Sequence, residues 1–322
     1  MGAGREPGEA TDDPRRAVLV AASLLACGGL ELPDVFRRFQ RWAAAGPKDV
    51  DLQTEAVLSS GDPWDTAAAL HFQVSRRVAG NGAMGAPPCS SETESSGERA
   101  APSAVYFARL GGDATVDAAR RLAAPAHGDR AAREGAAVLH ELVRVALAGD
   151  DPLAAVADAL RAVRSDHRDR YAAALAPDRH PDLATEFNGA VRPCPASAVR
   201  ALRTTTGYED AVRAAIDLGG DTDTVAAVSG GPAGAVHGTG AVPTRWTEAL
   251  RVPLPGFGGR VPRAADPADM ADRLETGPGR AGDAGLSGRP LPHRAPLTGF
   301  LSPEPSHSAF RASVVALASA AR

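Results

Sequence analysis

Apolar residues recur at helical spacing along most of the chain, and this periodicity constrains the fold more than any other feature. One stripe comprises Leu32, Val35, Phe36, Phe39 and Trp42, and a second comprises Val138, Leu139, Leu142, Val143, Ala146 and Leu147. Residues three or four positions apart share one face of a helix, so each stripe predicts a buried helix face. Alternating patterns typical of strands are scarce, and alanine, the best helix former, is abundant. The sequence therefore predicts an all-α fold.

The helical pattern breaks down in two polar segments rich in helix breakers. Residues 85–104 contain the polar run from Ser90 to Gly97, and we expect a mobile loop there. After residue 255 the chain is rich in Pro and Gly, with one short helical candidate from Pro267 to Leu274. We therefore expect a helical domain at residues 1–255 and a largely disordered tail at residues 256–322.

Composition excludes several classes of partner. The formal net charge of −4 gives no basic field for nucleic acid or for an anionic membrane surface. The three cysteines have no paired spacing and are odd in number, which fits a reducing compartment. No apolar run approaches the roughly 20 residues that a membrane span needs. We expect a cytoplasmic protein with no nucleic-acid or membrane partner, and the oligomeric state stays open.

The segment from Gly219 to Thr224 places two carboxylates and a hydroxyl in one tight turn before a helical pattern. Asp221, Asp223 and Thr224 are oxygen donors of the kind that Mg²⁺ prefers. The paired glycines permit positive φ or a close approach to a ligand, and the amides of a helix N-terminus would face the same place. The alternative is structural, because Asp and Thr are also ordinary N-cap residues.

A second acidic turn, Thr11-Asp12-Asp13, lies near the start of the chain and has the same kinds of donor. Pro14 follows at the expected first helical position, where the missing amide proton costs little. An apolar series at helical spacing then runs to the Gly28-Gly29 pair. Acidic capping is again the alternative, and either turn alone leaves both interpretations open.

A third motif, Ala79-Gly80-Asn81-Gly82-Ala83-Met84, lies between the two acidic turns. With these pieces in this order, and with Ala126-His127-Gly128-Asp129 and the continuation to Gly238, the chain resembles the ADP-ribosylglycohydrolase family. The resemblance covers most of residues 11–250 and implies an all-α fold: a compact orthogonal multi-helix bundle with a central binuclear metal site.

The resemblance also implies a reaction and a set of site residues. The reaction is metal-dependent hydrolysis of the glycosidic bond between ADP-ribose and a protein side chain or small conjugate, with two Mg²⁺ or Mn²⁺ ions as cofactors. The implied metal ligands are Thr11, Asp12, Asp13, Asp221, Asp223 and Thr224. Asp12 and Asp13 are also the expected catalytic residues, and Gly80, Asn81, Gly82 and His127 are expected to bind the ligand. An ADP-ribosylated protein or an ADP-ribose conjugate is the expected partner.

Several positions depart from the family pattern and keep a second hypothesis open. The family's glutamate-bearing segment is not found ahead of Thr11, and Pro14 stands where the family has a hydroxyl residue. Gly85-Ala86-Pro87-Pro88 replaces an apolar helix start, and Pro232 falls inside the helix expected after Thr224. The alternative is a catalytically impaired member that binds ADP-ribose or metal, or only retains the fold.

Overall fold

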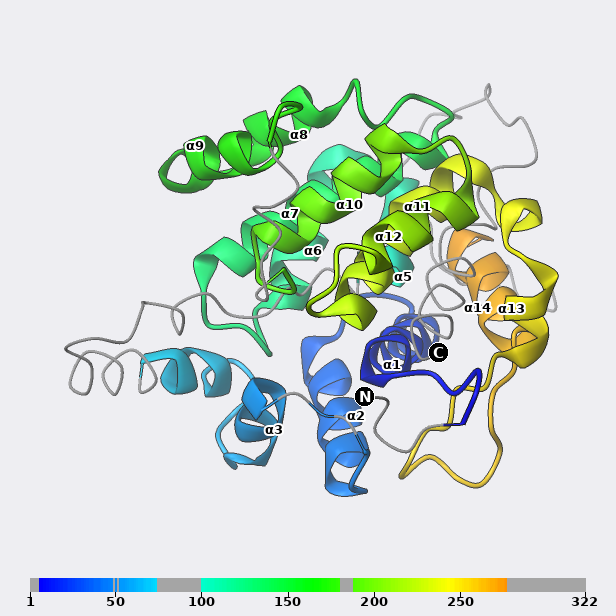
Figure 1. The fold of residues 1–322 in the computed structure, drawn as a ribbon. Helices are drawn as coiled ribbons and strands as arrows, with labels where there is room; N and C mark the ends of the chain where they lie inside the picture. The colour runs from blue at the N-terminus through cyan, green and yellow to red at the C-terminus, as the bar shows by residue number, and fades with distance from the viewer. Residues whose placement is uncertain (1–5, 49, 51, 74–99, 180–187, 277–322) are drawn as a thin grey trace, which may run out of the picture.

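The computed structural model describes residues 6–48, 50, 52–73, 100–179 and 188–276, and these residues form helices joined by turns (Figure 1). The helices are α1 (Asp12–Cys27), α2 (Leu32–Ala44), α3 (Leu52–Ser59), α5 (Ala100–Ala108), α6 (Gly112–Ala123), α7 (Arg130–Leu147), α8 (Val156–Ala162), α9 (Ser165–Ala174), α10 (Pro193–Thr204), α11 (Tyr208–Ile216), α12 (Thr222–His237), the 3₁₀ helix η3 (Thr239–Ala241), α13 (Thr244–Ala249) and α14 (Ala265–Thr276). No strand occurs in these ranges, so the all-α prediction is confirmed.

The predicted apolar stripes form the core as expected. Leu32, Val35, Phe36, Phe39 and Trp42 are the buried residues of α2, and all but the last member of the second stripe are buried in α7. Burying a large apolar side chain contributes roughly 1.5–3 kcal/mol. These stripes therefore fix which face of each helix points inward.

Two helices organise the packing around them. α1 contacts α2, α5, α12 and α14, and α7 contacts α5, α6, α8, α10 and α12. Figure 1 shows α7, α10 and α12 side by side, with α1 beneath α12. The middle of α12, from Val225 to Ala235, is buried throughout and consists of small residues. Small side chains let α10 and α11 approach α12 closely, and α12 continues through Pro232.

Two expected boundaries differ in the structure. α5 begins at Ala100 and its first residues are buried, so the loop expected at residues 85–104 does not extend past residue 99. α14 lies inside the expected tail at residues 256–322, and its Ala271 and Leu274 are fully buried. α14 confirms the helical candidate at Pro267–Leu274, and its packing against α1 and α5 shows that the disorder expected for the tail does not hold for residues 265–276. Residues 277–322 lie outside the described residues.

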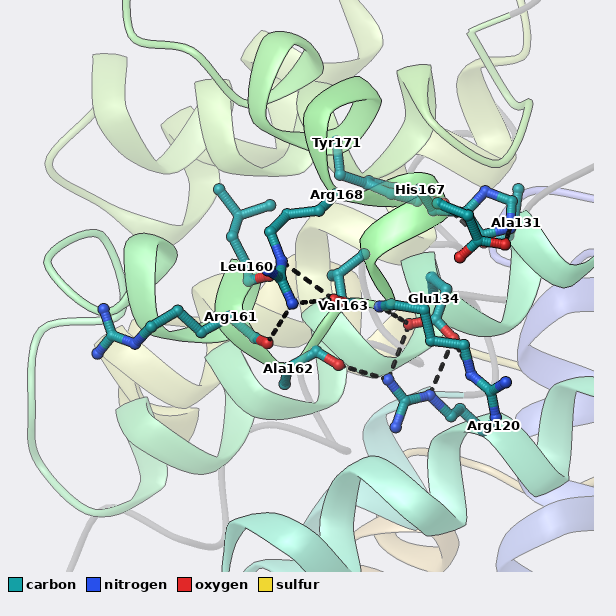
Figure 2. A network of polar contacts seen from close by, with 12 residues as sticks. Arg120, Ala131, Glu134, Leu160, Arg161, Ala162, Val163, His167, Arg168 and Tyr171 are labelled. Atoms are coloured by element: carbon teal, nitrogen blue, oxygen red, sulfur yellow. Dashed lines mark hydrogen bonds and ion pairs between the residues drawn. The ribbon is translucent and has the colours of Figure 1, made fainter.

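A buried acidic residue, Glu134, joins three segments through hydrogen bonds and ion pairs (Figure 2). Its carboxylate accepts two hydrogen bonds from Arg120 of α6, at 3.0 and 2.8 Å, and one from the amide of Arg164, at 3.0 Å. Arg120 also donates to the carbonyl oxygen of Ala162 at 2.6 Å. Glu134 therefore acts structurally, by joining α6 and α7 to the turn between α8 and α9.

In the described part of the chain, no helix is both long and apolar enough to cross a membrane. The cytoplasmic location expected from the sequence stays a prediction.

Candidate functional site

The turn before α12 adopts the geometry that its sequence predicts. Gly219 and Gly220 have φ values of +72° and +68°, in the left-handed region that favours glycine. They deliver Asp221 to the N-cap position of α12, where its carboxylate contacts the amide of Thr224 without a well-formed capping hydrogen bond. Asp221, Asp223 and Thr224 are all partly exposed.

The two carboxylates of this turn are crowded together. Burial raises the pKa of Asp221 above its ordinary value, and the neighbouring negative charge of Asp223 raises it further. Thr224 acts in the opposite direction but does not cancel the shift. A bound cation would offset the repulsion between the two carboxylates, so this pair is a suitable set of ligands for a divalent metal.

Asn188 holds the turn in place from a segment about thirty residues earlier in the chain. Its side chain is fully buried, donates to the carbonyl oxygen of Gly219 at 2.8 Å and accepts from the amide of Asp221 at 2.9 Å. The next residue, Gly189, lies directly under the Asp221 carboxylate. A Cβ atom at Gly189 would come within 1.9 Å of Asp221 Oδ2.

Asn188 and Gly189 were not among the residues expected from the sequence. Their only local signal is an Asn-Gly pair, which predicts an ordinary turn. Their importance comes from contacts that a local pattern does not contain.

The turn before α1 is more deeply buried than the turn before α12. Thr11 is 0% exposed, its Oγ1 has no hydrogen-bond partner, and it makes no side-chain cap to α1. The capping interpretation therefore does not explain the Thr11 hydroxyl, whereas a contact between the Asp221 carboxylate and the Thr224 amide leaves the capping interpretation open at the α12 turn. The turn is fixed from the other side, because the amide of Ala10 donates to the carbonyl oxygen of Arg251 at 2.8 Å.

The carboxylates of the α1 turn face an arginine of their own helix. Nη2 of Arg16 lies 2.8 Å from Asp12 Oδ2 and 2.5 Å from Asp13 Oδ1. The two acidic turns therefore differ: the carboxylates before α12 are close to each other, whereas those before α1 share an internal cation.

Other acidic groups near the α1 turn also have cationic partners. Glu9 pairs with Arg15 at 3.0 Å and with Lys48 at 3.5 Å, and Glu6 pairs with Arg251 at 2.7 Å. Burial alone would raise the pKa of Glu9, but the Glu6 amide, Lys48 and Arg15 together hold that pKa below its ordinary value. Glu9 is thus held as an ion-paired carboxylate.

The structure brings some predicted site residues near one another and leaves others outside. α1 and α12 are in contact, so the two acidic turns precede neighbouring helices. Among the described residues, however, no three His, Cys, Asp or Glu side chains are grouped closely enough to hold one ion. Gly80, Asn81 and Gly82 lie outside the described residues.

His127 lies in the turn before α7. Its side chain is 2% exposed, and the nearby Asp129 caps α7 by accepting from the amide of Ala131 at 2.9 Å. Ala131 packs with Val191, three residues after Asn188. This contact connects the start of α7 to the segment that braces the α12 turn.

A cavity of about 50 Å³ occurs elsewhere, between α9 and α10. Arg179, Arg200 and Arg203 contribute to its lining, and none of the acidic turn residues does. The cavity therefore does not mark the site that the acidic turns suggest.

The two acidic turns differ in how well their oxygen donors suit a hard divalent cation. The α12 turn fits well, because two crowded carboxylates and a hydroxyl are accessible and rigidly braced. The α1 turn offers the right oxygens, including the unpartnered Thr11 hydroxyl, but Arg16 already neutralises part of its charge. Two bound ions therefore stay a prediction for this chain.

Comparisons with known proteins identify the family of the chain. A solved structure described as an ADP-ribosylglycohydrolase-related protein complex is similar to the chain, with a TM-score of 0.50 and 29% sequence identity over 74% of this chain and 75% of the other. No curated protein matches. The sequence profile of the ADP-ribosylglycohydrolase family matches residues 1–282. Because this match spans most of its length, the chain belongs to the ADP-ribosylglycohydrolase family.

Proposed function

We propose that the protein is a metal-dependent hydrolase that cleaves the glycosidic bond between ADP-ribose and a protein side chain or small conjugate. The observation that carries this proposal is the braced, accessible pair of carboxylates before α12, in a chain that belongs to a family of ADP-ribosyl hydrolases.

Asp221, Asp223 and Thr224 would hold a Mg²⁺ or Mn²⁺ ion, and Thr11, Asp12 and Asp13 would contribute from the α1 turn. A divalent cation in such a site supplies charge stabilisation and lowers the pKa of bound water. The protein itself would position these ligands. Asn188 holds the α12 turn through two hydrogen bonds, and the positive φ values of Gly219 and Gly220 let the backbone turn sharply. Asp12 and Asp13 are the candidate catalytic residues.

The test is hydrolysis of ADP-ribosylated arginine, ADP-ribosylated serine and acetyl-ADP-ribose by the purified chain, with Mg²⁺ or Mn²⁺ and after chelation. We expect release of ADP-ribose from at least one substrate, with loss on chelation. Asp221→Asn should lower kcat/KM by about 100-fold or more, the scale seen when groups that bind or orient a catalytic metal are removed.

The matched control is Asp217→Asn, which removes the same charge from an exposed residue four positions earlier and should leave the rate unchanged. Equal rates for Asp221→Asn and wild type would contradict the proposal.

The second candidate is a catalytically impaired member that binds ADP-ribose or metal without cleaving the bond. One observation favours it: the carboxylates of Asp12 and Asp13 are paired with Arg16. Metal-dependent binding of ADP-ribose in calorimetry, without release from any of the three substrates, would support this candidate over the hydrolase.

A further inference from the structure

Arg16 lies one turn into α1, where its position in the helix brings it back to both acidic residues. Residues three and four positions apart are neighbours on a helix surface, so Arg16 reaches Asp13 and Asp12 at once. The ion pairs measure 2.5 Å and 2.8 Å. The three side chains are nearly inaccessible to solvent, with exposures of 5% for Arg16, 9% for Asp12 and 1% for Asp13.

A second helix holds the same guanidinium. Nη1 of Arg16 donates to Oγ1 of Thr54 at 3.2 Å, and Thr54 is 1% exposed in α3. Guanidinium is planar and presents several donors in a fixed arrangement, so contacts from two sides restrict its orientation. Arg16 is therefore a positioned cation, unlike the exposed arginines elsewhere on the surface.

The α1 turn and the α12 turn differ in net charge. Two carboxylates and one guanidinium leave one negative charge at the α1 turn, whereas Asp221 and Asp223 have no comparable arginine pair among the described ion pairs. A divalent cation at the Asp12 and Asp13 oxygens would lie beside a buried positive charge, and like charges in a poorly solvated place repel strongly.

We propose that Arg16 is an internal counter-ion that competes with divalent metal for Asp12 and Asp13. Metal binding at the α1 turn then requires the guanidinium to withdraw from the carboxylates, and Thr54 provides an acceptor that retains it. The α12 turn binds the tighter ion, and Arg16 sets how readily the α1 turn is occupied. This inference rests on the metal dependence of the proposed function.

The test measures metal affinity directly, without reference to activity. The full chain is titrated with Mn²⁺ by calorimetry and by electron paramagnetic resonance, as wild type, Arg16→Gln and Arg16→Lys. Arg16→Gln should bind Mn²⁺ about tenfold more tightly, or gain a second bound ion, in keeping with the size of effects from groups that contact metal ligands. Arg16→Lys keeps the charge and should stay within about threefold of wild type, which separates charge from side-chain volume.

Arg38→Gln is the matched control, because it removes an arginine from an i,i+4 pair with Asp34 in α2. Its Mn²⁺ affinity should equal that of wild type. If Arg16→Gln does not fold, as judged by thermal unfolding in chelator, Arg16→Met replaces it, because methionine is a good helix former of similar length.

The outcomes distinguish this inference from the proposed function. If wild type binds Mn²⁺ as tightly as Arg16→Gln and Arg16→Met do, the proposed role of Arg16 is overturned. The hydrolase proposal is not affected by this result. Tighter Mn²⁺ binding or an additional bound ion in Arg16→Gln, together with no release of ADP-ribose from any of the three substrates by wild type, supports the inference and points to the impaired member. Absence of binding in all variants overturns both.

Discussion

At the residue scale, the site depends on a glycine that no local pattern would select. The φ of Gly189 lies outside the left-handed region, so φ does not exclude alanine, but space does: its Cβ would lie 1.9 Å from Asp221 Oδ2 and 2.8 Å from the Asp221 Cγ. We therefore expect Gly189→Ala to displace Asp221, to weaken Mn²⁺ binding by about tenfold or more and to destabilise the fold by about 1–3 kcal/mol. Calorimetry and urea unfolding measure the two effects.

The control for this variant is Gly29→Ala, where a Cβ would meet nothing within 4 Å. It should leave metal binding unchanged and stability within about 1 kcal/mol of wild type. Unchanged Mn²⁺ affinity in Gly189→Ala would show that the Asp221 carboxylate is not a ligand.

The sequence identified the acidic residues but not the groups that position them. Carboxylates and hydroxyls can be recognised as oxygen donors from the sequence alone, so the sequence predicted the turns that contain Asp221 and Thr11. Asn188 lies 31 and 33 positions from the residues that it holds, and such pairing is not encoded in a short motif. The pairing of Arg16 with Asp12 was visible as i,i+4 spacing, but only its burial makes that pair significant.

At the scale of the element, α7 carries a buried histidine whose protonation should make stability depend on pH. Nδ1 of His140 lies 2.8 Å from the carbonyl oxygen of Ala136, and burial lowers the pKa of His140 to about 4 from 6.5. The unfolded chain therefore takes up a proton as pH falls from about 6.5 to about 4, while the folded chain stays neutral at this position. Folding stability should be complete above this window and should decrease through it.

The expected loss at His140 is about 2 kcal/mol between about pH 7.5 and pH 5, measured as the free energy of unfolding in urea. His140→Gln removes the titrating group and should flatten this part of the profile. A decrease of the same size in the variant would assign the pH dependence to other groups.

At the scale of the whole molecule, the sequence predicted the helical class and the inner faces but not the extent of the fold. Periodic stripes predicted α2 and α7 well, because many apolar residues at regular spacing outweigh local propensity. α14 has few apolar residues and lies among Pro- and Gly-rich segments, so the sequence indicated only a short helical candidate at Pro267–Leu274 within a tail that was otherwise expected to be disordered. Its burial depends on the partner surface that α1 and α5 provide.

α14 should therefore contribute to global stability through very few side chains. Leu274 is fully buried, and α14 packs on the helix that begins with the acidic turn. Leu274→Ala should cost about 2–4 kcal/mol, as truncations of buried leucine usually do, and lower the thermal midpoint. Leu110→Ala, at a leucine that is 53% exposed, should change it little. Well below the midpoint, Leu274→Ala should bind Mn²⁺ as wild type does, because Leu274 supports α1 without contributing a ligand. If the two leucine variants instead unfold at the same temperature, α14 is not part of the cooperative fold, and residues 256–276 belong to the tail after all.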